Sequence, residues 1–127
     1  MDIDHFKQYN DNYGHQKGDE VLIKFATCLK ESLNRSSDIA FRLGGEEFAV
    51  VYQSDTKEKA IEFANIIKSN IEDLKIKHEF NSASHYITAS MGLICKNAND
   101  FDDKIYKTVL EVFGLDSLKL LILRELV

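Results

Sequence analysis

The stretch RLGGEEFAVV, residues 42 to 51, decides the fold of this chain. Residues 39–43 and 47–53 are rich in β-branched and aromatic residues, which favour strands. Between them lie Gly44 and Gly45, and glycine readily adopts the positive φ angles that a tight hairpin turn requires. The pattern therefore predicts a β-hairpin.

Two adjacent carboxylates, Glu46 and Glu47, follow the glycines. In one interpretation they are solvated acids on an exposed turn. In the other they bind a metal ion, because clustered carboxylates repel one another and a hard divalent cation removes that repulsion. Mg²⁺ is typically bound by one or two carboxylates together with the phosphates of a nucleotide. Glycines without a Cβ atom would also let a triphosphate lie close to the hairpin backbone.

Two longer segments have hydrophobic residues at three- and four-residue spacing, which predicts amphipathic helices. The first runs over about residues 19–34, and the second begins at Asp55 or Thr56, either of which can cap it. The hydrophobic face of the first helix consists of Val21, Leu22, Phe25, Cys28, Leu29 and Leu33. That of the second consists of Ala60, Ile61, Ala64, Ile67, Ile71 and Leu74.

Shorter elements complete the pattern. Residues 1–3 are typical of the end of a strand, and Asp4 can cap a short helix that ends at Gly14. Residues 85–95 are expected to form another strand, followed by a helix from about Asp102. The order strand, helix, hairpin, helix, strand predicts an α+β, ferredoxin-like fold, also called a split βαβ fold. Its mainly antiparallel sheet of four strands should carry both long helices on one face.

This topology should bring together acids that are distant in sequence. With the hairpin in the middle of the sheet beside the first strand, Asp2 becomes a neighbour of Glu46 and Glu47. Successive strand residues point to opposite faces, so the two glutamates can share one task only if the turn brings both to one rim.

The composition indicates one globular domain over residues 1–127, without proline or a low-complexity linker. The formal net charge of −5 argues against binding of a nucleic-acid polymer. Residues 118–127 are too short to cross a bilayer and no signal peptide is visible, so we expect a cytoplasmic fragment without membrane contact, whose parent protein could still be anchored. Cys28 and Cys95 lack zinc or disulfide spacing and are expected to be core thiols.

Two blocks of the sequence resemble a known family. DIDHFKQYNDNYGHQKGDEVL, residues 2 to 22, and RLGGEEF, residues 42 to 48, together resemble the GGDEF domain of bacterial diguanylate cyclases in its GGEEF variant. The resemblance spans about residues 1–106, and residues 107–127 diverge. It implies a nucleotide-cyclase-like fold and an enzyme that condenses two GTP into cyclic di-GMP with release of two pyrophosphates. Each domain of an antiparallel homodimer would hold one GTP.

The resemblance also implies roles for the acids. Asp2, the backbone carbonyl of Ile3, Glu46 and Glu47 would bind two Mg²⁺ ions per GTP, with Mn²⁺ as a possible substitute. Glu46 would in addition help to deprotonate the ribose 3′-hydroxyl, which attacks the α-phosphate of the GTP in the partner domain.

Asn10 and Asp19 match the pair that reads guanine in this family. A carboxylate can accept from guanine N1–H and N2–H, whereas adenine offers a different pattern. Without the resemblance, Asp19 would be read as the N-cap of the helix that follows it, and both roles are compatible. The other predicted nucleotide contacts are Phe6, Lys7, His15, Gly44 and Gly45. Phe6 could instead be an ordinary core residue and His15 an ordinary surface residue.

Arg35 and Asp38 form an RxxD motif, and five residues separate Asp38 from Gly44. In the family this spacing marks the inhibitory site, where both residues bind guanines of the product cyclic di-GMP. The alternative is a loop that carries charges only for solvation.

The sequence departs from the family pattern at both ends. The family's N-terminal DxLTGLxNRR-like helix is not present, so Asp2 would lie on a frayed chain end. The phosphate-binding lysine and arginine of the family's last helix have no counterpart at matching spacing, which indicates a different packing helix or an altered reading frame. A second hypothesis is therefore a binding module that senses GTP or cyclic di-GMP without catalysis. A third is a structural interaction domain. A sensory or receiver domain is expected elsewhere in a longer parent protein.

Overall fold

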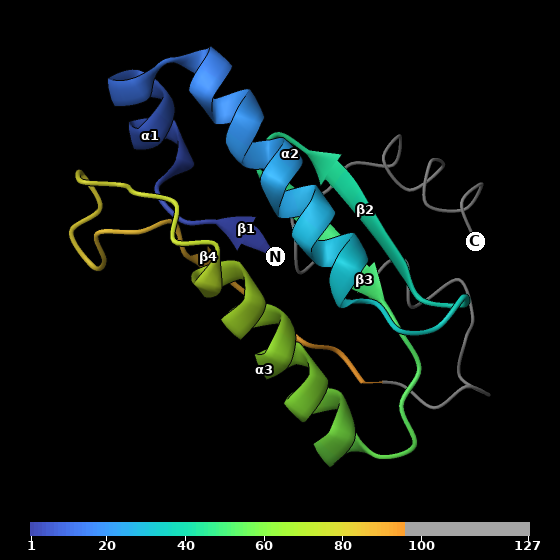
Figure 1. Ribbon diagram of the computed structural model, residues 1–127. Helices are drawn as coiled ribbons and strands as arrows, with labels where there is room; N and C mark the ends of the chain where they lie inside the picture. The colour runs from blue at the N-terminus through green and yellow to red at the C-terminus, as the bar shows by residue number, and fades with distance from the viewer. Residues whose placement is uncertain (96–127) are drawn as a thin grey trace. The chain divides into compact units, whose positions relative to one another are not determined.

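The structure is a computed structural model that describes residues 1–95, and the features below belong to the compact unit Met1–Leu93. Four strands form one antiparallel sheet in the order β2-β3-β1-β4. The strands are β1 Asp2–Ile3, β2 Ile39–Gly44, β3 Glu47–Val51 and β4 Ala89–Ser90. The helices are α1 Phe6–Tyr13, α2 His15–Ser32 and α3 Lys57–Asp73 (Figure 1).

This arrangement confirms the predicted α+β fold and its order of elements. One detail was wrong: of the two hairpin strands, only β3 lies beside β1, whereas β2 is an edge strand. The helix expected from about Asp102 lies outside the described residues. No helix within residues 1–95 has the length and hydrophobicity needed to span a membrane.

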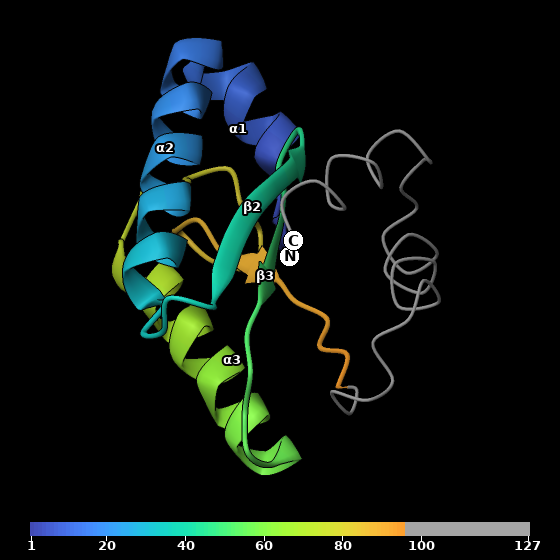
Figure 2. The same ribbon diagram turned by 90° about the vertical axis from the view of Figure 1, so that its right-hand side faces the viewer.

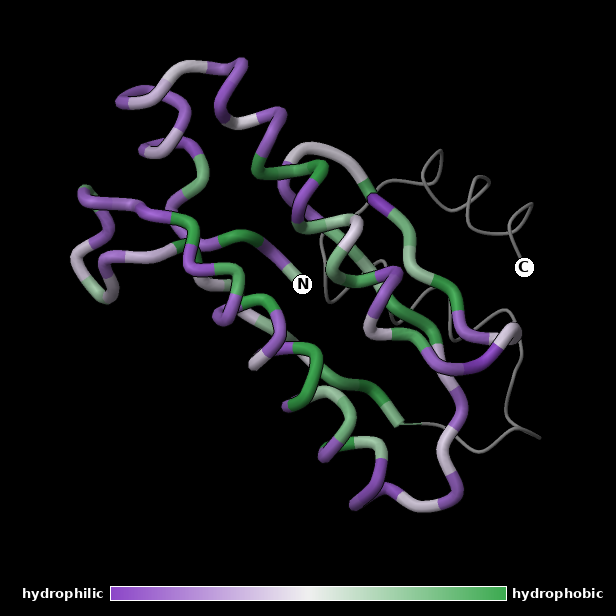
Figure 3. Tube along the Cα trace, in the orientation of Figure 1, coloured by the Kyte–Doolittle hydropathy of each residue, from purple (hydrophilic) through white to green (hydrophobic). Residues whose placement is uncertain are grey.

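The hydrophobic core lies between the sheet and the two long helices, which cover the same face of the sheet (Figure 2). Hydrophobic and hydrophilic residues alternate along α2 and α3 (Figure 3), as expected for helices with one buried side. Phe25 of α2 and Phe48 of β3 meet at the centre, with ring centroids 4.9 Å apart. The other core residues with almost no exposure include Ile3, Leu29, Ile67 and Ile71.

Helix α2 starts earlier than predicted. It begins at His15 directly after Gly14, whose φ of 89° lets α1 and α2 follow each other with no longer loop. Asp19 is thus the fifth residue of α2, and its interpretation as an N-cap was wrong. The predicted hydrophobic face is confirmed from Val21 to Leu29, with Phe25 and Leu29 fully buried, whereas Leu33 follows the end of α2 and is half-buried.

The predicted caps have mixed outcomes. Thr56 caps α3, since its hydroxyl accepts a hydrogen bond of 3.2 Å from the Lys59 amide. Asp4 does not cap α1. The cap position is His5, which has a left-handed φ of 54° and makes no side-chain cap.

Three further predictions need correction. Ile61 was assigned to the buried face of α3 but is 43% exposed. The hairpin turn consists of Gly45 and Glu46, because β2 extends to Gly44. Cys28 is buried as predicted, but Cys95 is exposed, so it is not a core thiol.

Candidate active site

Asp2 and Glu47 lie directly opposite each other on neighbouring antiparallel strands. Met1 and Phe48 exchange two backbone hydrogen bonds of 2.8 Å. Hydrogen-bonded and non-hydrogen-bonded pairs alternate along antiparallel strands, so Asp2 and Glu47 form a non-hydrogen-bonded pair. Side chains approach each other most closely at such pairs. Since Ile3 and Phe48 point into the core, the two carboxylates point to the opposite face of the sheet. The predicted proximity of Asp2 to the hairpin acids is confirmed.

The start of the chain is held in place. Met1 is buried, and its backbone is bonded to Phe48 on β3. On the other side, Asp2 lies opposite Ser90 and Ile3 opposite Ala89. The expectation that Asp2 would lie on a frayed end was therefore wrong.

The hairpin turn brings Glu46 to the same place. The Glu46 carbonyl accepts a hydrogen bond of 3.2 Å from the Ile3 amide, so the Ile3 backbone lies against the turn. Gly45 has a φ of 54°, which explains the need for glycine there. Its carbonyl accepts a bond of 2.8 Å from Arg42 Nε, which fixes the turn further.

The electrostatics reflect this crowding of acids. The pKa of Asp2 is raised, first by partial burial and then by the negative charges of Glu46, Glu47 and Asp4. Residues 1–95 contain no group of three or more His, Cys, Asp or Glu side chains already arranged to hold a metal ion. Mg²⁺, however, needs only one or two carboxylates when phosphate oxygens complete its shell, so the donor set at Asp2 and Glu47 fits such an ion.

The carboxylate of Asp4 connects the end of β1 to β4. It accepts hydrogen bonds of 2.8 Å from the Thr88 hydroxyl and 2.6 Å from the Ser90 hydroxyl. These contacts hold the backbone that carries Asp2. Neither hydroxyl residue was predicted, because nothing in a lone threonine and a lone serine identifies the acid that they contact.

The two guanine-reading candidates lie on consecutive helices. Asn10 lies on α1 and Asp19 on α2, and the Asn10 side chain packs against Gly18, the residue before Asp19. The contact between Gly18 and Asn10 was not predicted, because it depends on where α1 lies.

Comparison with known proteins decides the family. Residues 1–109 match the family described as "Diguanylate cyclase, GGDEF domain". The chain belongs to the GGDEF family. Diguanylate cyclase VdcA of Vibrio cholerae is 42% identical over 101 residues, which is 79% of this chain and 30% of VdcA. Diguanylate cyclase DgcM of Escherichia coli is 37% identical over 109 residues, or 86% of this chain and 25% of DgcM.

A solved structure supports the fold. The GGDEF domain of DgcB from Caulobacter crescentus, in complex with c-di-GMP, is 30% identical and has a TM-score of 0.56, covering 68% of this chain and 51% of that one. The present GGDEF chain thus spans about half of that solved domain and a third or less of the two curated relatives named above.

The remaining nucleotide candidates of the GGDEF domain lie around the same end of the sheet or on α1 and α2. Phe6 is buried and stacks near Tyr9, as the core interpretation requires. Lys7 and His15 are exposed on α1 and α2. Gly44 ends β2 at the hairpin turn.

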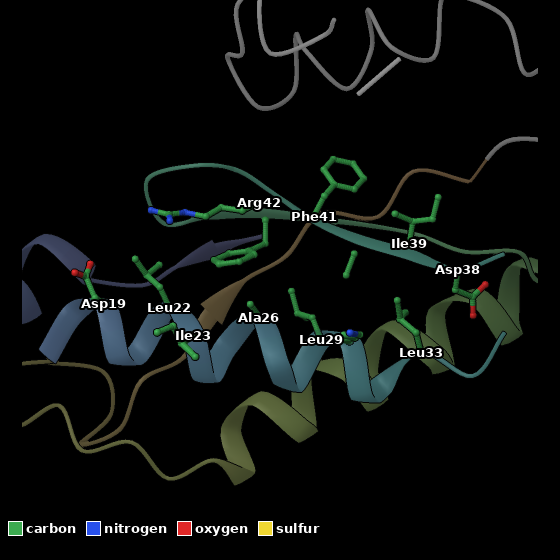
Figure 4. A pocket seen from close by; sticks show the side chains of 13 residues that line it. Asp19, Leu22, Ile23, Ala26, Leu29, Leu33, Asp38, Ile39, Phe41 and Arg42 are labelled. Carbon is green, nitrogen blue, oxygen red and sulfur yellow. The ribbon is translucent and has the colours of Figure 1, made fainter. Parts of the chain in front are cut away.

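A groove of about 820 Å³ lies between α2 and β2 of the GGDEF domain (Figure 4). Its lining is mostly hydrophobic, and Asp19 and Asp38 lie at its two ends. The acids Asp2, Glu46 and Glu47 do not line it. The hollow next to Asp19 is therefore separate from the acidic pair, which lies on the face of the sheet away from α2 and α3.

The RxxD motif forms a compact turn at the far end of β2. The Arg35 amide donates to Asp38 Oδ2 at 3.2 Å, and the Asp38 amide donates to the Arg35 carbonyl at 3.0 Å. The Arg35 guanidinium reaches the Gln53 carbonyl at 3.4 Å. With a strand rise of about 3.3 Å per residue, the motif lies roughly 20 Å from the hairpin turn.

Proposed function

We propose that this GGDEF domain condenses two GTP into cyclic di-GMP and releases two pyrophosphates. The observation that carries the proposal is the facing pair of Asp2 and Glu47, with the Glu46 turn beside it. Two like charges directly opposite each other in a sheet repel each other, and a divalent cation attracts both carboxylates.

In this proposal two Mg²⁺ ions, or Mn²⁺, would be held by Asp2, Glu46, Glu47 and the backbone carbonyl of Ile3. When bound, the ions would stabilise negative charge on the attacking and leaving oxygens. Glu46 accepts the proton of the ribose 3′-hydroxyl. The freed 3′-oxygen attacks the α-phosphorus of the second GTP, the bond from that phosphorus to the bridging α–β oxygen breaks, and pyrophosphate leaves. The 3′-hydroxyl of the second nucleotide then attacks the α-phosphorus of the first in the same way, which closes the ring and releases the second pyrophosphate.

Asn10 and Asp19 read the guanine, while Gly44 and Gly45 let the triphosphate approach the turn. Phe6 supports α1 from the core, and the exposed Lys7 and His15 contact the nucleotide, with Lys7 facing phosphate. Because one domain binds one GTP, the reaction requires a homodimer. Because GTP is a cytoplasmic nucleotide, we expect the reaction to take place in the cytoplasm. A sensory or receiver domain would belong to a longer parent protein.

We further propose product inhibition at Arg35 and Asp38. The compact turn holds both residues on one loop, and the Oδ1 atom of Asp38 is buried without a hydrogen-bond partner among residues 1–95. The distance from the hairpin turn would let product bind there without displacing GTP.

Incubation of the purified chain with GTP and Mg²⁺, followed by chromatography, tests the main proposal. Cyclic di-GMP should form, and Glu46→Gln should reduce its rate by at least about 100-fold, the usual contribution of a positioned base. Glu62→Gln, which changes an exposed glutamate on α3, serves as the matched control and should retain the rate. Unchanged turnover in Glu46→Gln would contradict the assignment.

The same samples address the second function, a binding module without catalysis. The RxxD turn favours it as an alternative, because this turn is built independently of the acidic pair. If no product forms but cyclic di-GMP binds and Arg35→Ala removes that binding, the domain is a sensor.

A further inference from the structure

We infer that Gly18 is a specificity-determining residue: its missing side chain leaves the space that the Asn10 amide occupies beside Asp19, and so sets how well guanine is recognised. This inference rests on the proposed function, in which Asn10 and Asp19 bind the base.

Glycine is an unfavourable residue at this position. Gly18 is the fourth residue of α2 and is buried. Glycine inside a helix destabilises it by about 0.5–1 kcal/mol relative to alanine, because a glycine loses more backbone conformational entropy than an alanine when the chain folds. Helix preference alone would therefore favour alanine, and the glycine requires another explanation.

The contact with α1 provides that explanation. A Cβ atom on Gly18 would overlap Oδ1 of Asn10 and lie 2.9 Å from its Cγ. The three heavy atoms nearest to such a Cβ all belong to the Asn10 side chain, and none belongs to the backbone. Gly18 thus makes room for one side chain rather than for a close approach of two helix backbones.

The contact fixes the orientation of the Asn10 amide. Oδ1 of Asn10 is buried against Gly18 and has no hydrogen-bond partner in the described part of the chain. An alanine would push the amide aside without breaking a hydrogen bond of that oxygen. The protein should therefore stay folded, while the amide loses the orientation that prepares it for guanine.

Four variants test this inference: Gly18→Ala, Asn10→Ala, the double variant, and Gly92→Ala as the control. A Cβ at Gly92 meets no atom of residues 1–95 within 4 Å. Dissociation constants for GTP and for ATP are measured in Mg²⁺ by calorimetry, and thermal unfolding is measured without nucleotide.

We expect Gly18→Ala to weaken GTP binding about 3- to 10-fold, which corresponds to one misplaced hydrogen bond of about 1 kcal/mol. ATP binding should not change, so the preference for GTP falls by the same factor. The melting temperature should stay the same or rise, as helix preference predicts. Added to Asn10→Ala, the Gly18 substitution should cause no further loss, since the group through which it acts is gone. Gly92→Ala should bind GTP like the original chain.

Three results would overturn the inference: GTP binding unchanged in Gly18→Ala, an equal further loss in the Asn10→Ala background, or a clear drop in melting temperature that indicates a packing role. If the original chain shows no preference for GTP over ATP, the proposed function itself fails, and the inference fails with it.

Discussion

At the scale of single residues, the facing carboxylates of Asp2 and Glu47 are the most informative feature. The pKa of Asp2 is raised by partial burial and by three neighbouring carboxylates. A raised folded-state pKa means that, between the ordinary value and the raised value, the folded state binds more protons than the unfolded state. Stability therefore falls as pH rises through this window, and the full penalty remains above it.

The first prediction follows from this decrease in stability with rising pH. Without divalent cations, Asp2→Asn should raise the free energy of unfolding at neutral pH by about 0.2–1 kcal/mol, the range for a cross-strand pair. The gain should vanish as the pH falls below the ordinary pKa of an aspartate, where Asp2 is protonated in both states. Urea unfolding at several pH values measures it.

Asp11→Asn, which changes an exposed aspartate on α1, is the control and should show no such pH-dependent gain. A loss of stability in Asp2→Asn at neutral pH would show that Asp2 is held by a favourable contact instead.

At the scale of elements, much of the fold could be predicted from the sequence. The hairpin followed from Gly44 and Gly45 between strand-forming segments, and the turn indeed needs a positive φ at Gly45. The buried face of α3 followed from residues at three- and four-residue spacing. Ile61 does not fit that face because it comes one residue, or about 100° of helix rotation, after the buried Ala60.

Other boundaries depend on partners that the sequence does not reveal. Residues 85–95 have the composition of a long strand, but β4 pairs only at Ala89 and Ser90. Its partner β1 has just two residues, and a ladder cannot be longer than its shorter strand. Similarly, Asp4 is a residue type that favours helix caps, yet the hydroxyls of Thr88 and Ser90 hold its carboxylate.

The second prediction concerns the cap of α3. Thr56→Ala should lower the free energy of unfolding by about 0.5–2 kcal/mol, because the Lys59 amide loses its acceptor. Thr56→Ser keeps the hydroxyl and should remain near the original value. Chemical unfolding followed by circular dichroism compares the two. Equal losses in both variants would mean that the threonine methyl group, and not the cap, provides the stability.

At the scale of the whole molecule, the hydrophobic core of the unit Met1–Leu93 packs against the strands that carry the acids. Phe25 on α2 packs on Phe48 of β3, and Phe48 directly follows Glu47. The proximity of Asp2 to the hairpin was predictable from topology alone. The contact between Asn10 and Gly18 was not, because it depends on the angle between α1 and α2 that the Gly14 backbone sets.

The third prediction tests this core. Phe25→Ala should lower the free energy of unfolding by about 3–5 kcal/mol, the usual cost of removing a buried phenyl ring. Ile23→Ala, two residues earlier on the same helix and 66% exposed in the original chain, should change it by less than about 0.5 kcal/mol. Similar effects of the two substitutions in urea unfolding would contradict the packing described for α2.

The central claim is that Asp2 and the hairpin acids together bind the divalent cation of a bound nucleotide. Adding Mn²⁺ and GTP to the ¹⁵N-labelled chain and following amide signals by NMR tests it most directly, because a paramagnetic ion broadens the signals nearest to it. The account predicts the strongest broadening at Asp2, Ile3, Glu46 and Glu47 and the weakest in the RxxD turn, and Asp2→Asn should suppress it. Strongest broadening elsewhere in the chain, or the same pattern in Asp2→Asn, would contradict the account.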